Sequence, residues 1–445
     1  MTKNYEDNWP QLPEYAKARL QHLRDAPDAP QFTGQSGARL QPAELDRLMK
    51  SKPALQADPQ ASPDWLATFV HQCLSQVPRY RSYTTEYARH SFEALPCVSR
   101  ADLSADIGAF VPDNLPLDEL IAYETSGTTG HPLIIPSHPR VAARYHCFHE
   151  KALNWHGVDL RGQDGATGVV LAGFQKRCFT YVSVIPYWGY KGLVKLNLHP
   201  DDWPEPKARQ RYLDTLKPIL ISGDPCSFIE LLAIELKHKP KALLSTSMTL
   251  LEGLRQRLES TFECPVVDCY SMNEAGPIAA ADGRYPGMRL LQPHLHVEIV
   301  NCSGEPQPLG VRGEVCLTGG FNDYLPLLRY RTGDYASLWR SPEGHFYLNA
   351  LSGRPPVRFY TQSGWINNVD MTHRLQPFAL SQFQLHQNRD ASVTLQLSEH
   401  CDQHQLMNTL TDVFGSNWPI KIQQTMARTE KVVQYTSDFP GGLCQ

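Results

Sequence analysis

The chain lacks the features that mark membrane, secreted and nucleic-acid-binding proteins. Its 445 residues carry 42 Lys and Arg against 46 Asp and Glu, so no basic excess would attract nucleic acid broadly. No apolar run approaches the roughly 18 residues that a membrane helix needs. The amino-terminal stretch MTKNYEDNWPQLPEY has no apolar signal core. We therefore expect a cytoplasmic protein that binds neither nucleic acid nor membrane.

Cysteine spacing is equally uninformative about metals. The eleven cysteines are scattered, and none forms a Cys-x-x-Cys pair. A metal site assembled from distant Cys and His residues stays open. In a cytoplasmic chain we expect these cysteines to be mostly buried thiols without disulfides. The composition is 41% hydrophobic and 20% charged, which favours a large folded core over disorder.

The middle of the chain predicts an α/β fold. Short apolar runs alternate there with helical patterns, which is typical of a parallel sheet covered by helices on both faces. In such sheets ligands bind beyond the carboxyl ends of the strands. The strand candidates are 168–173, 181–185, 219–223, 241–245 and 265–270, with helices expected over 227–236 and 250–262.

The later part of the chain changes character. Spaced short strands between Gly, Asn, Asp and Pro over 287–350 favour an antiparallel sheet or a small barrel. Beyond residue 354, a strand pattern at 393–397 and a helical pattern at 401–414 predict a small α+β domain. We therefore divide the chain into an extension at 1–60, a large domain at 61–354 and a small domain at 355–445.

One polar stretch is a candidate phosphate cradle. It reads Thr125-Ser126-Gly127-Thr128-Thr129-Gly130. Glycine lets several backbone N–H groups face one concavity, and the hydroxyls add donors that rotate to suit a polyphosphate. The stretch lacks the Lys-Ser/Thr ending of a Walker loop, because His131 and Pro132 follow it. On these residues alone, an ordinary polar surface loop fits equally well.

Three further stretches follow in order, and together with the loop they carry a resemblance. They are Tyr270-Ser271-Met272-Asn273-Glu274, then Tyr330-Arg331-Thr332-Gly333-Asp334, then Gly353-Arg354. The set resembles the adenylate-forming superfamily of acyl-CoA synthetases, peptide-synthetase adenylation domains and luciferases. The elements at 77–80, 95–103 and 326–334 are most similar to the phenylacetate–CoA ligase-like branch. The resemblance spans residues 62 to 354.

The resemblance implies an architecture and a set of roles. It implies a large amino-terminal part with parallel sheets and a barrel-like subdomain, followed by a small carboxyl-terminal domain. ATP and a carboxylic acid would form an acyl-adenylate, which is chemistry of positioning and charge stabilisation. The implied roles are phosphate binding for Thr125–Gly130 and Asn273, nucleotide binding for Ser271, Mg²⁺ binding for Glu274, adenine stacking for Tyr270, ribose binding for Asp334, and a ribose or phosphate contact for Arg354.

Each implied role has a structural alternative. Tyr270 could be a core residue at the end of a sheet, and Glu274 a charge at the start of a helix. Asp334 could be a turn residue, and Arg354 only a hinge contact. Asn273 stands where Thr is common, and both side chains can hydrogen-bond to phosphate.

The acyl pocket is expected near Pro186–Gly192. This segment resembles the family's Pro-x-aromatic-His-x-x-Gly pattern, with Gly189 where many members carry His. The rings of Tyr187, Trp188 and Tyr190 suit an aromatic or cyclic acid, although packing in the core is the alternative. Ser245 and Thr246, at the end of another strand, are expected to line the same cavity.

A carboxyl-terminal lysine carries the adenylation step in this superfamily, and Lys431 is the candidate here. It lacks the usual preceding Gly, and Lys421 is the fallback. Pro355-Pro356 occupies the expected hinge and restricts rotation there. We therefore expect either a pivot at Ser363-Gly364 or a reduced domain swing.

The resemblance thus implies an ATP- and Mg²⁺-dependent ligase. The enzyme would adenylate a small carboxylic acid and then pass the acyl group to CoA or to the phosphopantetheine of an acyl carrier protein. Two alternatives stay open. In one, the adenylate goes to an amine or a partner reductase without a thioester. In the other, the protein is a nucleotide-binding relative without turnover. The sequence leaves a dimer open.

Overall fold

The computed structural model describes residues 12–34, 40–61, 63–87, 91–118, 120–124, 133–161, 167–176, 178–353, 357–399, 401–427 and 432–442. The chain divides into two compact units that are each built from separate stretches. The first unit holds the described residues within 38–159 and 269–354, and the second holds those within 12–37, 160–268 and 355–445. No helix in these ranges has the length and apolarity to cross a membrane.

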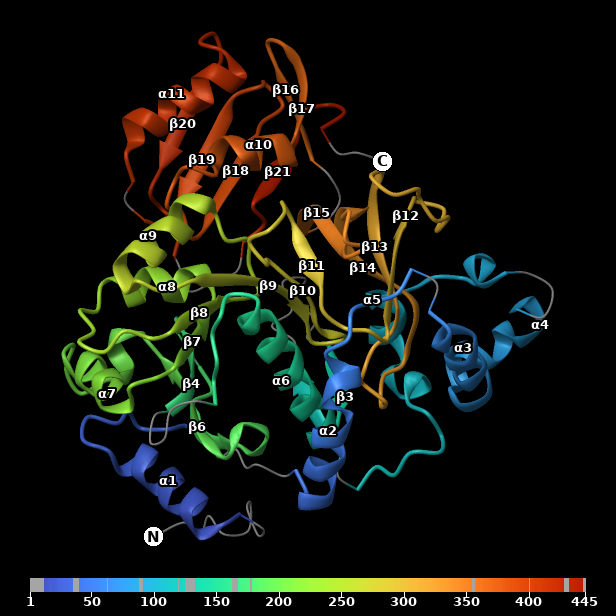
Figure 1. Cartoon of the computed structure of the whole chain (residues 1–445). Helices are drawn as coiled ribbons and strands as arrows, with labels where there is room; N and C mark the ends of the chain where they lie inside the picture. The colour runs from blue at the N-terminus through green and yellow to red at the C-terminus, as the bar shows by residue number, and fades with distance from the viewer. Residues whose placement is uncertain are drawn as a thin grey trace. The chain divides into compact units, whose positions relative to one another are not determined.

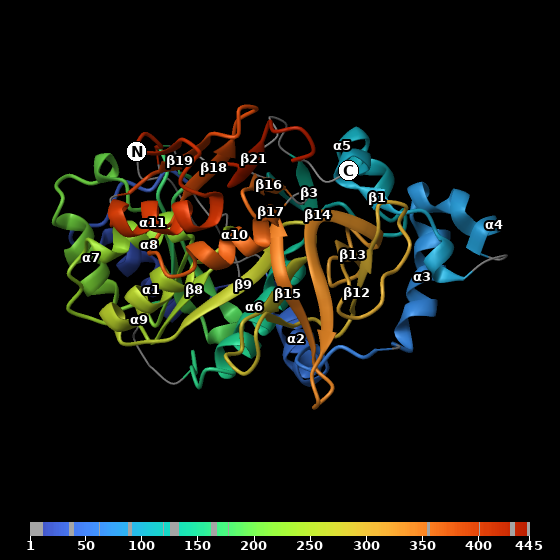
Figure 2. The same ribbon diagram turned by 90° about the horizontal axis from the view of Figure 1, so that it is seen from above.

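The first unit is built on antiparallel strands. From the outside inward they pair in the order β12-β13-β14-β15-β11-β10-β9, and each neighbouring pair is antiparallel. Figure 2 shows the long strand β14 between β13 and β15. The antiparallel sheet expected over 287–350 is therefore confirmed, while its closure into a barrel stays a prediction. The bounds are β9 (Val266–Met272), β10 (Gly276–Ala280), β11 (Met288–Leu290), β12 (Leu295–Val300), β13 (Arg312–Gly319), β14 (Leu327–Arg340) and β15 (Phe346–Gly353).

The earlier residues of this unit add helices and three short strands. The two-residue strand β1 runs parallel to β14, and β2 pairs with β3 as a separate antiparallel ribbon. The α-helices are α2 (Pro42–Leu55), α3 (Trp65–Gln76), α4 (Thr84–Tyr87), α5 (Arg100–Ala105) and α6 (Pro139–Asn154). The short strands are β1 (Val98–Ser99), β2 (Ile121–Glu124) and β3 (Ile134–Ser137).

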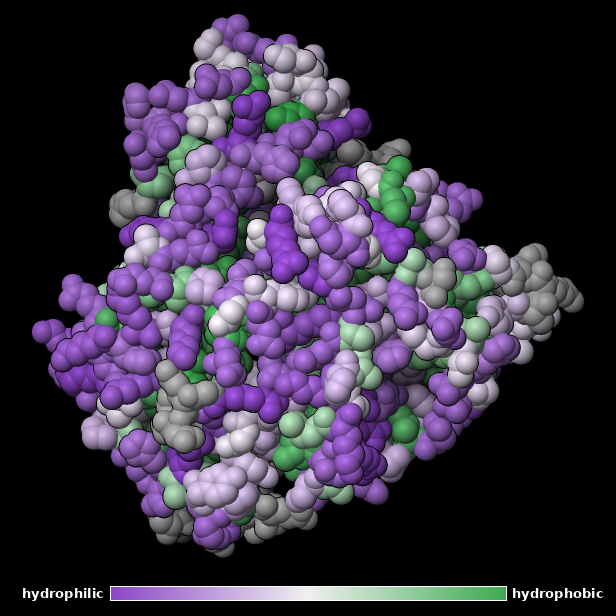
Figure 3. All heavy atoms as spheres, viewed as in Figure 1, coloured by the Kyte–Doolittle hydropathy of each residue, from purple (hydrophilic) through white to green (hydrophobic). Residues whose placement is uncertain are grey.

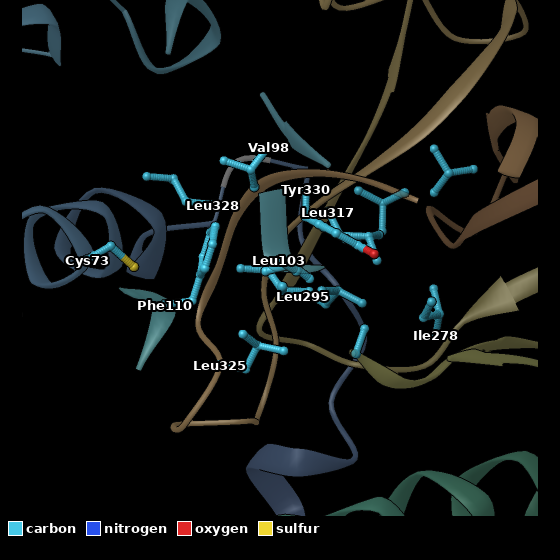
Figure 4. Close-up of a cluster of buried hydrophobic side chains, with 14 of the residues drawn as sticks. Cys73, Val98, Leu103, Phe110, Ile278, Leu295, Leu317, Leu325, Leu328 and Tyr330 are labelled. Carbon is cyan, nitrogen blue, oxygen red and sulfur yellow. The ribbon is translucent and has the colours of Figure 1, made fainter. Parts of the chain in front are cut away.

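The core of the first unit gathers side chains from both its helices and its strands. Figure 4 shows Cys73 of α3, Leu103 of α5 and Ile278 of β10 around the strands, with Tyr330 beside Leu317. Tyr330 and Leu317 are register partners across β14 and β13. Removing this much apolar surface from water is the main force that holds the unit together. The core therefore fixes where Tyr330 can reach.

A buried arginine ties four segments of this unit together. The Arg329 side chain is 2% exposed and donates to both carboxylate oxygens of Glu298, at 3.2 and 3.3 Å. It also donates to the Leu95 carbonyl at 2.8 Å, to the Gly304 carbonyl at 2.7 Å and to the Glu93 carbonyl. Because a buried guanidinium is costly unless its donors are satisfied, these bonds hold the 93–95 stretch and the 304 loop against β14.

The second unit contains a mostly parallel sheet in the order β9-β8-β7-β4-β6-β5, with β9 entering it through Val266–Asp268. The strands β4, β7, β8 and β9 run parallel, as expected from their apolar runs, and β6 joins them in the same direction. Helices separate the later strands, again as expected. The bounds are α1 (Glu14–Asp25), β4 (Thr167–Gly173), β5 (Tyr181–Ile185), β6 (Lys191–Asn197), α7 (Ala208–Leu216), β7 (Leu220–Gly223), α8 (Pro225–Leu232), β8 (Ala242–Ser245) and α9 (Glu252–Phe262).

One strand departs from the parallel expectation. β5 pairs antiparallel with β6, a strand that the sequence reading missed. The two are joined by the short connection 186–190, in which Gly189 and Tyr190 both have positive φ angles. So few residues can join antiparallel neighbours but cannot make a parallel crossover. The prediction that 181–185 belongs to the parallel set is therefore wrong.

The carboxyl-terminal residues of the second unit form a small sheet. Its strands pair in the order β20-β19-β18-β21, with the hairpin β16–β17 beside it in sequence. In Figure 1 these elements and the helices α10 and α11 are orange to red. The strand and helix expected at 393–397 and 401–414 are confirmed as β19 and α11. The bounds are β16 (Arg358–Thr361), β17 (Gly364–Asn367), α10 (Asn368–Leu375), β18 (Phe383–Gln387), β19 (Val393–Leu397), α11 (Gln403–Phe414), β20 (Ile420–Gln423) and β21 (Tyr435–Ser437).

The alternative hinge at Ser363-Gly364 falls inside a hairpin turn. Thr361 pairs with Gly364 across β16 and β17, and the Thr361 hydroxyl donates to the Gly364 carbonyl at 2.8 Å. A turn that returns the chain to a paired strand cannot act as a pivot for a domain. The expectation of a pivot at this pair is therefore wrong, and Pro355-Pro356 lies outside the described residues.

The face of the molecule drawn in Figure 3 is mostly hydrophilic, with hydrophobic residues scattered over it. Scattered apolar residues are ordinary on a protein surface and need no partner to explain them. The predicted division of the chain at residues 60 and 354 stays a prediction.

We expect Arg329→Ala to lower the free energy of unfolding by about 3–5 kcal/mol, because it leaves Glu298 buried without its partner. Arg340→Ala is the matched control on the same strand, since Arg340 is exposed. That control should cost less than about 1 kcal/mol. Urea unfolding followed by fluorescence measures both. Equal losses for the two variants would contradict the structural role of the buried pair.

Candidate nucleotide site

The hairpin between β9 and β10 carries four of the predicted site residues. Tyr270 and Ser271 lie in β9, and Asn273 and Glu274 lie in the turn that follows it. Gly276 closes this turn with a φ of 70°. A Cβ atom there would lie 2.4 Å from the ring of Tyr145 on α6, so glycine is required for the close approach.

Glu274 is buried and held by two donors. Its Oε1 atom accepts from Arg100 Nη1 and from the Tyr330 hydroxyl, each at 3.2 Å. The residue is 5% exposed, so a carboxylate here needs such partners to offset the loss of water. Both bonds go to Oε1, which leaves Oε2 as the oxygen available to another ligand.

Arg100 reaches Glu274 because of how α5 begins. Val98 and Ser99 pair in parallel with Tyr330 and Arg331 of β14, which anchors the chain just before the helix. Ser99 and Asp102 form a capping box at the start of α5, with Asp102 accepting from the Ser99 backbone at 2.8 Å. The strand pairing and the cap together set the position of Arg100.

Asp334 lies against Tyr270. The Tyr270 hydroxyl donates to Asp334 Oδ2 at 2.6 Å, and the Asp334 amide donates to the Thr332 hydroxyl at 3.0 Å. Gly353 of β15 is the register partner of Asp334, and a Cβ atom there would lie 3.4 Å from Asp334 Oδ1. The pairing therefore brings Gly353, the first residue of the Gly353-Arg354 motif, next to Asp334.

Burial changes the ionisation of Asp334. Removal from water raises the pKa of this carboxyl from 3.8 to about 6, and the nearby carboxylates of Glu274 and Glu314 act in the same direction. The hydrogen bond from Tyr270 opposes the rise. The carboxyl is therefore largely ionised at neutral pH and becomes protonated in mild acid.

The structure thus brings Tyr270, Glu274 and Asp334 into one network, although their roles stay predictions. The sequence reading did not give Arg100 and Tyr330 any role. Both stand inside stretches that carried the resemblance, so their place in those stretches was the available signal. The predicted residues Thr125–Gly130, Arg354 and Lys431 lie outside the described residues.

The predicted acyl-pocket residues lie at opposite edges of the sheet of the second unit. Ile185 pairs with Lys191 at the amino-terminal edge, where β4 and β7 begin, so Tyr187, Trp188, Gly189 and Tyr190 lie beyond that edge. Ser245 ends β8 at the carboxyl-terminal edge, opposite Gly223, and Thr246 follows it. The expectation that both groups line one cavity is therefore wrong.

The aromatic residues at the amino-terminal edge pack against their surroundings. Tyr187 and Trp188 are buried, and the Arg161 guanidinium lies 5.1 Å from the Tyr187 ring. Tyr190 contacts α1, where Tyr15 meets its ring at 5.7 Å and Arg19 donates to its carbonyl at 2.7 Å. These contacts favour the core alternative for this segment.

The carboxyl-terminal edge offers a different set of groups. Ser245 Oγ is buried and has no hydrogen-bond partner within the described part of the chain. Phe174 directly follows β4 and stacks on His199, which lies just after β6, with ring centres 5.4 Å apart. Ligands of parallel sheets bind beyond this edge, so it is the better candidate for an acyl site.

The described residues contain no cluster of three or more His, Cys, Asp or Glu side chains arranged to hold a metal ion. The ten described cysteines are free thiols, as expected for this chain. Oxygen ligands suit Mg²⁺, and the open Oε2 atom of Glu274 fits such an ion.

Comparisons with known proteins agree with this picture. Residues 120–322 match the family described as AMP-binding enzyme. Protein CapK of Staphylococcus aureus is 23% identical over 257 residues, which are 55% of this chain and 53% of CapK. The chain therefore spans about half the length of the curated relative that it matches.

Solved structures show the same fold. A 2-hydroxyisobutyryl-CoA ligase in its postadenylation state, in complex with R3-HIB-AMP, aligns with a TM-score of 0.63 and 18% identity over 87% of this chain and 92% of the ligase. The same ligase with 2-HIB-AMP and CoA, in its thioesterification state, aligns with a TM-score of 0.51 and 19% identity over 89% of each chain.

The fold is thus the mixed α/β fold of these ligases, with a large mixed sheet and a small carboxyl-terminal sheet. The match to the AMP-binding enzyme family lies in residues 120–322, and the likeness to the solved ligases is one of fold.

The raised pKa of Asp334 makes stability depend on pH in a defined direction. Because the native state binds this proton more strongly, the free energy of unfolding should fall by up to about 3 kcal/mol as pH rises from 3.8 to about 6. Asp334→Asn cannot ionise and should lack this fall. Urea unfolding between pH 4 and 8 measures the difference between the two proteins.

Asp64→Asn is the matched control, since Asp64 is exposed at the start of α3 and caps no backbone N–H. Its stability profile should follow the wild type at every pH. Parallel profiles for wild type and Asp334→Asn would show that Asp334 does not titrate in this range.

Proposed function

We propose that this chain is an ATP- and Mg²⁺-dependent ligase of the phenylacetate–CoA ligase-like branch. It joins a small carboxylic acid to AMP with release of pyrophosphate and then passes the acyl group to a thiol, either CoA or a carrier-protein phosphopantetheine. The proposed compartment is the cytoplasm, on the composition alone.

One observation supports this proposal most directly. Glu274 and Asp334 come from motifs 60 residues apart, yet Tyr270 bonds to Asp334, and Tyr330 of the Asp334 strand bonds to Glu274. An ordinary turn residue or helix-start charge would not need this shared network. The network lies in the unit that contains residues 120–159 and 269–322 of the segment matched by the AMP-binding family.

In this proposal Glu274 would hold Mg²⁺, and its Oε2 atom is open to the ion while Arg100 and Tyr330 donate to Oε1. The bound ion would neutralise charge on the nucleotide phosphates. Ser271 and Asn273 beside it, together with Thr125–Gly130, would donate hydrogen bonds to the phosphates. These donors position the α-phosphorus for attack by the substrate carboxylate.

Asp334 would accept hydrogen bonds from the ribose hydroxyls through its Oδ1 atom, because Oδ2 already accepts from Tyr270. Tyr270 would stack on adenine while its hydroxyl orients Asp334. Arg354 follows Gly353, the register partner of Asp334, and would contact the ribose or the phosphates.

The acid would bind beyond the carboxyl-terminal edge of the parallel sheet, near Ser245 and Thr246. We do not retain Tyr187, Trp188, Gly189 and Tyr190 as substrate residues, because they lie at the other edge. The ring pair of Phe174 and His199 at the carboxyl-terminal edge keeps an aromatic or cyclic acid as the proposed substrate class.

The decisive experiment is acid-dependent exchange of labelled pyrophosphate into ATP across a panel of carboxylic acids. Exchange with at least one acid supports adenylation, and CoA consumption with the same acid supports the thioester step. Exchange without CoA consumption points to a carrier-protein, amine or reductase acceptor. No exchange with any acid would favour a nucleotide-binding protein without turnover.

With an active acid in hand, Glu274→Gln should lower exchange and raise the Mg²⁺ concentration needed for half-maximal rate. Changing even an outer-shell partner of a metal ligand costs about 10- to 100-fold, so a loss of at least about tenfold is expected. Glu343→Gln, an exposed glutamate in the same unit, should leave both quantities unchanged. An unaltered Mg²⁺ dependence in Glu274→Gln would move the metal role elsewhere.

The two lysine candidates can be separated in the same assay. Lys431→Ala should cut adenylate formation by at least about 10²-fold if this lysine stabilises the transition state. Lys421→Ala, at the exposed position of β20, should then leave the rate near that of the wild type. The reverse pattern would assign the role to Lys421 instead.

A further inference from the structure

The turn that carries Glu274 receives limited support from its own two strands. β9 and β10 pair through Met272 and Gly276 on either side of the turn, and the pairing then shifts register between Pro277 and Ala279. Pro277 has no backbone N–H and cannot donate to the ladder. A register shift of this kind leaves a residue unpaired and bends the strand. The backbone beside Glu274 therefore needs contacts from elsewhere in the unit.

A fully buried glutamine makes two such contacts. Gln292 is 1% exposed, and its Nε2 atom donates to the Ala275 carbonyl at 2.7 Å and to the Pro277 carbonyl at 2.6 Å. A carbonyl oxygen can only accept, so these partners identify which end of the amide is the nitrogen. One bond lies on each side of Gly276, the residue that closes the turn. The amide thus joins the two carbonyls that flank this glycine.

The backbone on both sides of Gln292 is itself fixed. Leu291 extends the pairing of β11 with β10, and its carbonyl accepts from Lys151 Nζ of α6 at 3.0 Å. The Pro293 carbonyl accepts from Trp65 Nε1 of α3 at 3.2 Å. Because a strand and two helices hold its neighbours, the side chain of Gln292 reaches the turn from a rigid base.

The amide of Gln292 is not explained by packing. Its Oε1 atom is buried and has no hydrogen-bond partner among the residues that the structure describes. A buried acceptor without a partner is destabilising, and a methionine of similar volume would fill the same space without that cost. The two bonds to the turn are what a glutamine provides here and a methionine does not.

These bonds complete the support of Glu274. Its Oε1 atom is held by Arg100 and Tyr330, each at 3.2 Å. The Ala275 carbonyl, to which Gln292 donates, lies one residue after Glu274 in the chain. Side-chain bonds can aim a carboxylate only if the backbone that carries it is also held in place. Gln292 fixes that backbone, and the other two residues fix the carboxylate.

We propose that Gln292 is a positioning residue that holds the turn of Glu274 in the geometry that binds Mg²⁺ together with the nucleotide. The inference rests on the proposed function, since it gives Gln292 a part in the metal site of that reaction. Gln292 contacts neither the ion nor the nucleotide and acts only through the carbonyls of Ala275 and Pro277.

Gln292→Met tests the proposal in the pyrophosphate exchange assay with an active acid. The variant keeps the volume and loses both bonds, so the Mg²⁺ concentration needed for half-maximal rate should rise by at least about fivefold. Saturating Mg²⁺ should restore the maximal rate. A merely structural role would reduce the amount of folded protein and hence the maximal rate, without changing the Mg²⁺ dependence. An unchanged Mg²⁺ dependence would overturn the proposal.

Gln307→Met is the matched control. Gln307 lies in the turn between β12 and β13, and its Nε2 atom also donates to two backbone carbonyls, those of Glu305 and Pro306, at 3.2 and 3.4 Å. The control should keep the Mg²⁺ dependence of the wild type. An equal shift in both variants would show that the effect is not specific to the turn of Glu274.

Gln292→Asn provides a second test that keeps a polar side chain. It retains the amide but is one methylene group shorter, so it cannot make both bonds from the same backbone position. It should raise the Mg²⁺ requirement in the same direction as Gln292→Met. Thermal melting checks that each variant folds. A wild-type Mg²⁺ requirement in a folded Gln292→Asn variant would contradict the proposal.

A double variant tests whether Gln292 acts through Glu274. If it does, Glu274→Gln combined with Gln292→Met should need the same Mg²⁺ concentration as Glu274→Gln alone, because residues that act as one unit are not additive. Additive increases would show that Gln292 acts on another group and would overturn the proposed route.

Hydrogen–deuterium exchange separates this inference from the proposed function. Backbone amides of residues 271–278 should exchange at least about fivefold faster in Gln292→Met than in the wild type, with those of β14 unchanged. Equal amide exchange in the two proteins would overturn the inference whether or not the protein is a ligase. If the wild type showed no acid-dependent pyrophosphate exchange, the proposed function would fail, and faster amide exchange would still support the hold of Gln292 on the turn.

Discussion

The buried guanidinium of Arg329 is the constraint on which the first unit depends. It fills its donors with Glu298 and with backbone carbonyls from two other segments. Each of these groups would be costly to bury alone, so the bonds are worth far more intact than broken. The result is that the 93–95 stretch cannot drift from β14. The residues that follow this stretch, including β1 and Arg100, are therefore held close to β14.

Strand β14, held in place by Arg329, carries two of the residues of the candidate nucleotide site. Tyr330 and Asp334 lie on this one strand and bond to Glu274 and Tyr270 of the β9–β10 hairpin. Regular strands are stiff, and the pairing of β14 with β13 and β15 fixes its register. A site supported in this way can hold the carboxyl groups of Glu274 and Asp334, because each of them accepts hydrogen bonds from its own donors.

The sequence could predict the motifs but not all of their surroundings. Apolar runs and turn residues were enough for the antiparallel sheet, for most of the parallel strands and for the carboxyl-terminal strand and helix. The position of 186–190 was not predictable in the same way. Its aromatic residues are of the kind that line pockets. The direction of β5, however, depends on its pairing with β6, and the Lys and Gly residues of β6 interrupt the apolar run that would have identified this strand. Contacts such as Arg100 to Glu274 depend on long-range register, which local patterns do not encode.

The two carboxyl groups of the site differ in a way that fits their proposed roles. Glu274 faces a cation, Arg100, whereas Asp334 accepts a bond from the neutral hydroxyl of Tyr270. If a cationic side chain already neutralised both carboxyl groups, a bound metal ion would gain little electrostatic energy from either of them. Because the bonds to Glu274 occupy Oε1, an ion at Oε2 would add to the existing contacts without breaking them. Burial raises the pKa of Asp334, so new hydrogen-bond donors to this carboxyl would stabilise its charged form.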